Sequence, residues 1–301
     1  MINKYDYVLQ LIILFAIVFA GFLIAQVVAV LIFLVGGGTL ADMLLPGDEH
    51  INLLKISQIF ASIITFVVPA VVFSYLKTNN PIKYHSFKFP FVLSALGLTI
   101  LLVYVFFPAM TQSYIWNQAI EFPSFLSGIE ELFKSLEEQA AALTESLLQM
   151  DSIGDLLLNL LMVGVVAGFA EEILFRGTIQ KFLVEWWGNH HIAIILTGLI
   201  FSAIHMQFYG LIPRWLLGIL FGYIFYFTKN IWMPIIAHTV FNSTQVLAYY
   251  FSQTGAINVN VDEVETVPIF AVLISVILTA ALFYLLYQRR VVDEPNLIYG
   301  E

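Results

Sequence analysis

The sequence predicts an all-α fold: a polytopic membrane helical bundle of about eight transmembrane helices with one amphipathic interfacial helix. Three observations predict this class. Of the 301 residues, 60% are hydrophobic and 11% are charged, whereas a soluble domain carries about 25% charged residues. The mean hydropathy is +0.90. Long apolar stretches recur along the chain, so too little polar surface remains to cover a soluble globule.

The composition also excludes several function classes. A net charge of −9 gives no basic surface for nucleic acid, and the hydropathy excludes a soluble enzyme and a disordered chain. The absence of cysteine excludes disulfides, a thiol nucleophile and Cys-ligated metal sites. Any metal site must therefore be built from His, Asp, Glu or Asn.

Eight stretches are long enough to cross a bilayer, which takes roughly 20 apolar residues per helix. They are Val8–Val35, Ile56–Leu76, Phe91–Met110, Leu156–Trp186, Ile192–Met206, Leu211–Phe227, Ile231–Tyr250 and Val267–Tyr287. The first exceeds the roughly 7–15-residue core of a signal peptide, so we interpret it as an anchor. We expect one integral-membrane domain over residues 1–301, without a soluble domain between the spans.

The basic residues predict the orientation of the bundle. With eight spans both termini share one side, and nine Lys and Arg residues fall there against three on the other side. The nine are Lys4, Lys77, Lys83, Lys88, Arg176, Lys181, Lys229, Arg289 and Arg290, and the three are Lys55, Lys134 and Arg214. The positive-inside rule then predicts a multi-pass protein of the cytoplasmic membrane with both termini in the cytoplasm.

The long connection between the third and fourth spans, residues 112–155, contains a helical pattern. Apolar residues recur at spacings of three and four from Phe125 to Leu147, and glutamates take much of the other face. Two interpretations fit this pattern. The segment is either an amphipathic connector lying on the bundle or an interfacial helix that admits or shields a substrate.

The fourth span carries charges at membrane depth, where ionisable residues are costly and usually functional. Glu172 and Arg176 are one helical turn apart and can pair. Glu171 points about 100° away on the helix, so it needs a partner from another span. His205 in the fifth span matches its depth, and His238 with Asn242 in the seventh share one helix face.

This set of side chains predicts peptide hydrolysis, in one of two arrangements. In the first, Glu171 is the general base and holds a water together with His205, while His238 and Asn242 stabilise the oxyanion. In the second, Glu171, His205 and His238 bind a zinc ion whose fourth position takes water. The spacing fits both arrangements, so the metal dependence stays open.

Three motifs in this order resemble the CPBP family of intramembrane proteases, which comprises type II CAAX prenyl endopeptidases and Abi membrane proteins. They are Glu-Glu-x-x-x-Arg from Glu171 to Arg176, Phe-x-x-x-His from Phe201 to His205, and His-x-x-x-Asn from His238 to Asn242. The resemblance covers residues 155–250, the expected catalytic core. It implies an eight-helix bundle whose site lies inside the membrane and opens towards the cytoplasm.

The resemblance also implies roles and partners. Glu171 is the base, Glu172 with Arg176 organises the site, and the two histidines with Asn242 assist. The implied substrate is a membrane-associated peptide or lipidated protein, such as a prenylated CAAX protein. The other implied partner is the membrane lipid that surrounds the helices. Two other classes remain: a non-catalytic scaffold or bacteriocin-immunity protein of the same family, and a transporter with a carboxylate proton relay. A transporter predicts inverted repeats, which the sequence does not contain.

Overall fold

The computed structural model describes residues 2–40, 43, 50–89, 92–257 and 266–289, and within these ranges the regular structure is helical. The helices before the long connection are α1 (Tyr7–Val35), α3 (Ile51–Ser62), η3 (Ile63–Val67), α4 (Val68–Thr78), α5 (Pro81–Tyr84) and α6 (Leu93–Gln118). The connection contains η4 (Ser124–Leu126) and α7 (Ser127–Leu148). The predicted helical bundle is confirmed.

The second half contains the segments that carry the charged and polar residues. They are α8 (Ile153–Asn159), η5 (Leu160–Val166), α9 (Ala167–Leu174), η6 (Phe175–Gln180), α10 (Lys181–Trp187), α11 (His190–Ala203), η7 (Phe208–Gly210), α12 (Leu211–Thr228), α13 (Trp232–Gln253) and α14 (Ile269–Gln288). From α8 to α10 the helix is unbroken, with π-helical turns at η5 and η6. Such turns often occur at functional sites.

Each predicted span coincides with a helix. In the described part of the chain, six helices are long and apolar enough to cross a membrane: Tyr7–Val35, Ile51–Thr78, Leu93–Gln118, Ile153–Trp187, Phe208–Thr228 and Ile269–Gln288. The other two predicted spans correspond to α11, which has only 14 residues, and α13, which has 22 residues including several polar ones. The protein is therefore a multi-pass membrane protein.

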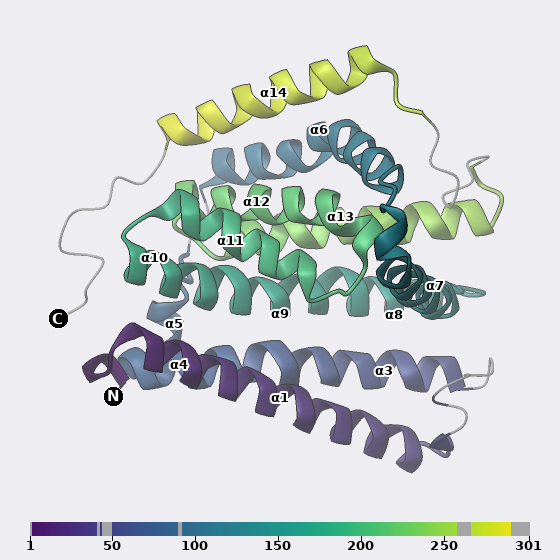
Figure 1. The fold of residues 1–301 in the computed structure, drawn as a ribbon, viewed down its shortest axis with the longest axis horizontal. Coiled ribbons are helices and arrows are strands. Elements are labelled where there is room, and N and C mark those ends of the chain that lie inside the picture. The colour runs from purple at the N-terminus through teal and green to yellow at the C-terminus, as the bar shows by residue number, and fades with distance from the viewer. Residues whose placement is uncertain (1, 41–42, 44–49, 90–91, 258–265, 290–301) are drawn as a thin grey trace.

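The helices form three layers (Figure 1). On one side lies α1, packed against the continuous helix formed by α3, η3 and α4. On the other side lies α6, packed against α14. Between them lie the helices of the second half, from α8 to α13. α1 begins and α14 ends at the same end of the bundle, as an even number of spans requires. The outer helices expose large apolar side chains, which suits contact with lipid.

The central layer is held by close helix packing. α11 and α12 meet at two glycines, where a Cβ added to Gly218 would lie 2.7 Å from the Cα of Gly198. A Cβ added to Gly222 would lie 2.8 Å from Cγ2 of Ile194 on α11, so packing inside the bundle accounts for both glycines of the Gly-x-x-x-Gly pattern of Gly218 and Gly222. The buried side chains of α12 and α13, among them Phe221 and Phe241, form the largest apolar cluster together with α6.

The amphipathic helix predicted in the connection is confirmed as α7. It crosses one end of the bundle (Figure 1), where it contacts α3, α13 and η7. None of its residues is buried, and its glutamates face outwards or along the bundle surface. It lies at the end of the bundle opposite to the start of α1.

Candidate active site

Glu172 is the centre of a buried polar cluster. Its Oε1 atom accepts a hydrogen bond from Nη1 of Arg176 at 2.5 Å and one from Nδ1 of His238 at 2.9 Å. The side chains of Glu172 and Arg176 are fully buried. The expected pair is therefore present, and it also fixes the ring of His238, whose Nδ1 must carry the hydrogen that the carboxylate accepts.

The guanidinium of Arg176 is enclosed on all sides. Nη2 donates to the carbonyl oxygen of Gly218 at 2.9 Å, which joins the fourth span to α12. The carbon Cζ lies 4.7 Å from the ring centroid of Phe201 and 5.3 Å from that of Phe221. Cation–π contacts gain strength when the cation is desolvated. Arg176 is thus a structural cation that orders the site rather than a group free to bind a substrate.

Glu171 faces the other nitrogen of the same histidine. Its Oε2 atom lies 4.0 Å from Nε2 of His238, and its side chain keeps 14% of its accessible surface. The predicted partner from another span is therefore His238 on α13. A separation of 4.0 Å is too long for a direct hydrogen bond, but one water can bridge the two atoms.

Two glycines of the fourth span set the distance between these groups. A Cβ on Gly168 would lie 3.0 Å from the backbone nitrogen of Thr239, and a Cβ on Gly164 would lie 2.4 Å from Oγ of Ser243. Real Cβ atoms seldom approach a backbone atom so closely, so glycine at Gly168 allows this helix spacing, whereas at Gly164 only the hydroxyl of Ser243 would have to turn aside. The close approach of α9 and η5 to α13 brings the two glutamates within reach of His238.

His205 lies outside the helix in which we expected it. The predicted fifth span ran to Met206, but α11 ends at Ala203, because the next residues form tighter i to i−3 hydrogen bonds and Met206 has a φ of 55°. Nδ1 of His205 donates to the carbonyl oxygen of Phe201 at 2.8 Å. Its Nε2 is then a hydrogen-bond acceptor. The ring centroid of Phe201 lies 5.3 Å from that of His205 and 5.8 Å from that of His238, so one phenyl ring contacts both histidines.

Asn242 lies one turn beyond His238 on α13. Its Nδ2 donates to the carbonyl oxygen of Val163 at 2.8 Å, which ties α13 to η5. In the described part of the chain its second amide hydrogen has no protein acceptor. Asn242 therefore combines an anchored side chain with one free donor.

The histidines and glutamates do not gather as a metal site in this arrangement. Within the described residues, no three His, Asp or Glu side chains are placed to hold one ion together. Nδ1 of His238 is occupied by Glu172, and only Nε2 points towards Glu171. The donor set of Glu171, His205 and His238 does not fit a zinc ion as it stands, so no step below passes through a metal. The zinc arrangement stays the alternative hypothesis from the sequence, and the function proposed below does not use it.

Comparison with known proteins finds a family model that matches the part of the chain containing this site. Residues 153–244 match the family model described as type II CAAX prenyl endopeptidase Rce1-like. These residues form an Rce1-like segment. The resemblance predicted from the three motifs is confirmed there, and the segment contains each of the six predicted site residues, from Glu171 to Asn242.

Two proteins of Bacillus subtilis (strain 168) are similar to part of the chain. One, named "Putative membrane peptidase YdiL", is 31% identical over 98 residues, which are 33% of this chain and 40% of that protein. The other, "Uncharacterized protein YpbD", is 29% identical over 92 residues, which are 28% of this chain and 42% of that protein. The matches thus span about two fifths of these relatives. No solved structure matches the chain.

Arg214 is a charged residue near the site to which the sequence assigned a role only in the orientation of the bundle. Arg214, in the first turn of α12, interacts electrostatically with both Glu171 and His205. A signal was present in the sequence, because Arg214 is a cation in an otherwise apolar helix. Its distance from the motifs along the chain concealed the connection.

Proposed function

We propose that this protein is an intramembrane endopeptidase that hydrolyses a peptide bond of a membrane-associated substrate of the prenylated CAAX type. One observation carries the proposal. One carboxylate oxygen of Glu172 accepts hydrogen bonds from Arg176 and His238. The neighbouring Glu171 faces the remaining nitrogen of that histidine across 4.0 Å. The Rce1-like segment supports the same conclusion.

The first chemical step is the attack of a water held between Glu171 and His238. The water donates one hydrogen to Oε2 of Glu171 and the other to Nε2 of His238. As its oxygen bonds to the carbonyl carbon, one proton passes to Glu171 and the carbonyl π electrons move to the oxygen. General base catalysis of this kind contributes roughly 10²- to 10⁴-fold.

The second step breaks the carbon–nitrogen bond. The tetrahedral intermediate collapses, the carbonyl re-forms, and Glu171 returns its proton to the leaving amine. We assign the free amide hydrogen of Asn242 to the oxyanion, because a fixed donor there stabilises the charge as it develops. We assign His205 to the substrate, since its acceptor Nε2 can take a hydrogen bond from a peptide N–H.

Glu172 and Arg176 position these groups and take no part in proton transfer. Glu172 holds His238 in one ring orientation, and Arg176 neutralises the buried carboxylate. This division of labour between neighbouring glutamates agrees with the roles that the family resemblance implies.

We further propose the cytoplasmic membrane as the location, with both termini in the cytoplasm. The lysines near the start of α1 and the ends of α4 and α12 support this orientation through the positive-inside rule. α7 and η7 then lie on the opposite side, since α12 rises roughly 27 Å between its ends. If a substrate enters beside α7, the site opens away from the cytoplasm, contrary to what the resemblance implies.

Cleavage of a farnesylated CAAX peptide by the purified protein, followed by mass spectrometry, tests this function. We expect the wild type to cleave the peptide and Glu171→Gln to lose at least 100-fold in rate while remaining folded. Glu145→Gln, at an exposed position on α7 outside the residues that line the groove there, is the matched control. A folded Glu171→Gln protein with wild-type cleavage would refute the catalytic assignment. A wild type without cleavage, whose biological effect survives Glu171→Gln, would favour the scaffold.

A further inference from the structure

Arg214 is a partly buried cation whose charge has no close counterpart. In the described part of the chain it forms no ion pair within 4.0 Å, and its carboxylate neighbours Glu137 and Glu171 act on it at longer range. Nη2 donates to Oε1 of Gln207 at 2.9 Å. Nη1 is buried and has no hydrogen-bond acceptor among the described residues.

An unsatisfied guanidinium nitrogen in such a place requires an explanation. Leaving a buried donor unpaired costs free energy, and more so for a charged group. The planar fork of a guanidinium matches a carboxylate, which it can bind through two parallel N–H groups. Since Nη1 is free and Nη2 holds a neutral amide, the free donor of Arg214 is built to receive an anionic oxygen.

The local backbone makes room for this side chain. A Cβ on Gly210 would lie 2.6 Å from Nη2 of Arg214, so glycine is what allows the guanidinium to lie against η7. Gly218, one turn after Arg214 on α12, accepts the hydrogen bond of the site residue Arg176. Arg214 is therefore placed one turn away from the buried cluster, on the side of η7.

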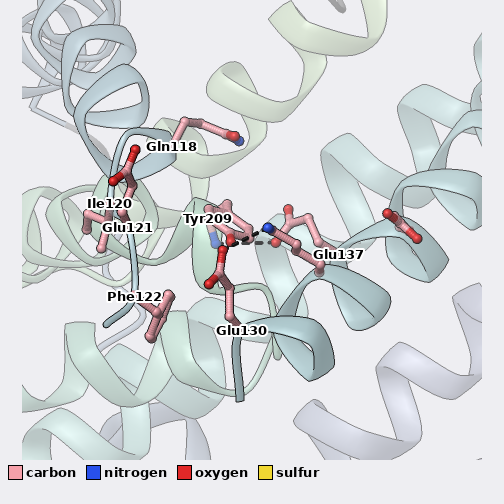
Figure 2. Close-up of a pocket in the computed structure, with 9 residues that line it drawn as sticks. Gln118, Ile120, Glu121, Phe122, Glu130, Glu137 and Tyr209 are labelled. Carbon is pink, nitrogen blue, oxygen red and sulfur yellow. Dashed lines mark hydrogen bonds and ion pairs between the residues drawn. The ribbon is translucent and has the colours of Figure 1, made fainter. Parts of the chain in front are cut away.

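A polar groove at the end of the bundle comes within two hydrogen bonds of this side chain, because its lining residue Glu137 accepts from Gln207, which in turn accepts from Arg214. It has a volume of about 680 Å³ and runs between the end of α6, α7 and η7, with Glu130, Glu137 and Tyr209 among its lining residues (Figure 2). Oε2 of Glu137 accepts the backbone N–H of Tyr209 at 3.3 Å, and Oε1 accepts Nε2 of Gln207 at 3.5 Å.

Glu137 thus brings a carboxylate from α7 to the same Gln207 that Arg214 holds. Burial raises the pKa of this carboxyl group above its usual range, while the N–H of Tyr209 and the charge of Arg214 oppose that rise. Because α7 already holds the carboxylate of Glu137 near the guanidinium of Arg214, a carboxylate is the ligand that this site would accept.

We propose that Arg214 binds the C-terminal carboxylate of the substrate, so that the protease selects peptides that end near the cleaved bond. The proposal rests on the proposed function and adds its specificity. A chain end enters along the groove beside α7, displaces Glu137 from the neighbourhood of Gln207, and gives Nη1 of Arg214 its acceptor. The same guanidinium orients the peptide beside Glu171 and His205, with which it interacts electrostatically.

The test compares two forms of one dye-labelled farnesylated CAAX peptide, ending in a free carboxylate or in an amide. We expect the wild type to prefer the acid in kcat/KM by roughly tenfold to 100-fold, the range for a hydrogen bond to a charged group. Arg214→Gln is expected to bring the acid-to-amide ratio close to one. Lys83→Gln removes an exposed cation at the other end of the bundle and is expected to keep the wild-type ratio.

Gly210→Ala provides a second variant in case Arg214→Gln does not fold. Its φ of −106° suits alanine, and the added methyl group displaces the guanidinium without removing its charge. We expect it to lower the ratio as well. Equal use of acid and amide by the wild type, or an unchanged ratio in a folded Arg214→Gln protein, would overturn the proposal.

Binding separates this proposal from the proposed function. If the wild type cleaves neither peptide, fluorescence anisotropy of the same two probes measures the preference without catalysis. Tighter binding of the acid that disappears in Arg214→Gln would support the carboxylate site while the protease assignment fails. Equal binding of both probes would reject the site.

Discussion

Gly168→Ala tests whether the spacing of two helices controls the chemistry. The new Cβ would lie 3.0 Å from the backbone nitrogen of Thr239, whereas ordinary contacts begin at 3.4 Å. The helices must therefore separate by roughly 0.4 Å (3.4 minus 3.0). That movement carries His238 away from Glu171, because His238 precedes Thr239 on α13.

The magnitude follows from the sensitivity of catalysis to position. A misplacement of about 1 Å can cost roughly 100-fold, so 0.4 Å corresponds to a loss of roughly threefold to tenfold in kcat/KM. Overpacking adds a cost of about 1–3 kcal/mol, partly offset by the gain of about 1 kcal/mol when alanine replaces glycine in a helix. We expect lower activity and unchanged or slightly reduced stability.

Steady-state cleavage of the farnesylated peptide and thermal unfolding in detergent measure both effects. Gly97→Ala on α6 is the control, since a Cβ there meets nothing within 4 Å. It gains the same helix propensity without the steric cost. Full activity of Gly168→Ala, with stability raised as much as in Gly97→Ala, would show that this helix contact does not set the site geometry.

Three further predictions concern pH, orientation and metal. Burial lowers the pKa of His85 to about 4, so the folded state resists protonation of this ring. The contribution of neutral His85 to the free energy of unfolding is complete above pH 6.5 and falls as the pH drops towards 4. His85→Gln is expected to make the melting temperature less dependent on pH across that window. A single cysteine in this cysteine-free chain reports topology; an impermeant thiol reagent on intact cells is expected to label Glu138→Cys and spare Lys83→Cys, and the reverse pattern would invert the bundle. Elemental analysis is expected to find zinc below stoichiometry, with cleavage surviving chelation; stoichiometric zinc that is lost in His205→Ala would establish the metal alternative instead.

Much of the fold was predictable because the bilayer makes strong demands on a chain. Each span must be apolar over roughly 20 residues, and the eight predicted stretches coincide with helices. The Glu172–Arg176 pair was also predictable, since residues four apart share a helix face. The periodicity of the connection predicted α7 for the same reason.

The contacts between helices were not predictable, because spacing within one helix says nothing about its register against another. The sequence paired Glu171 with His205 by depth, whereas the structure places His238 opposite it. It extended the fifth span through His205, and the left-handed φ of Met206 cannot be read from a residue that is not glycine. The position of Arg214 near the site could not be predicted either, because it depends on the turn that η7 forms.

Neighbouring glutamates offer the most direct test of the central claim, that Glu171 activates water while Glu172 holds the site together. The measurement is cleavage and thermal stability of Glu171→Gln and Glu172→Gln, prepared side by side. Glu172→Gln leaves the buried Arg176 charge unpaired, which costs about 3–5 kcal/mol. The account predicts a folded, inactive Glu171→Gln protein and a strongly destabilised Glu172→Gln protein. A stable Glu172→Gln variant beside an active Glu171→Gln variant would contradict it.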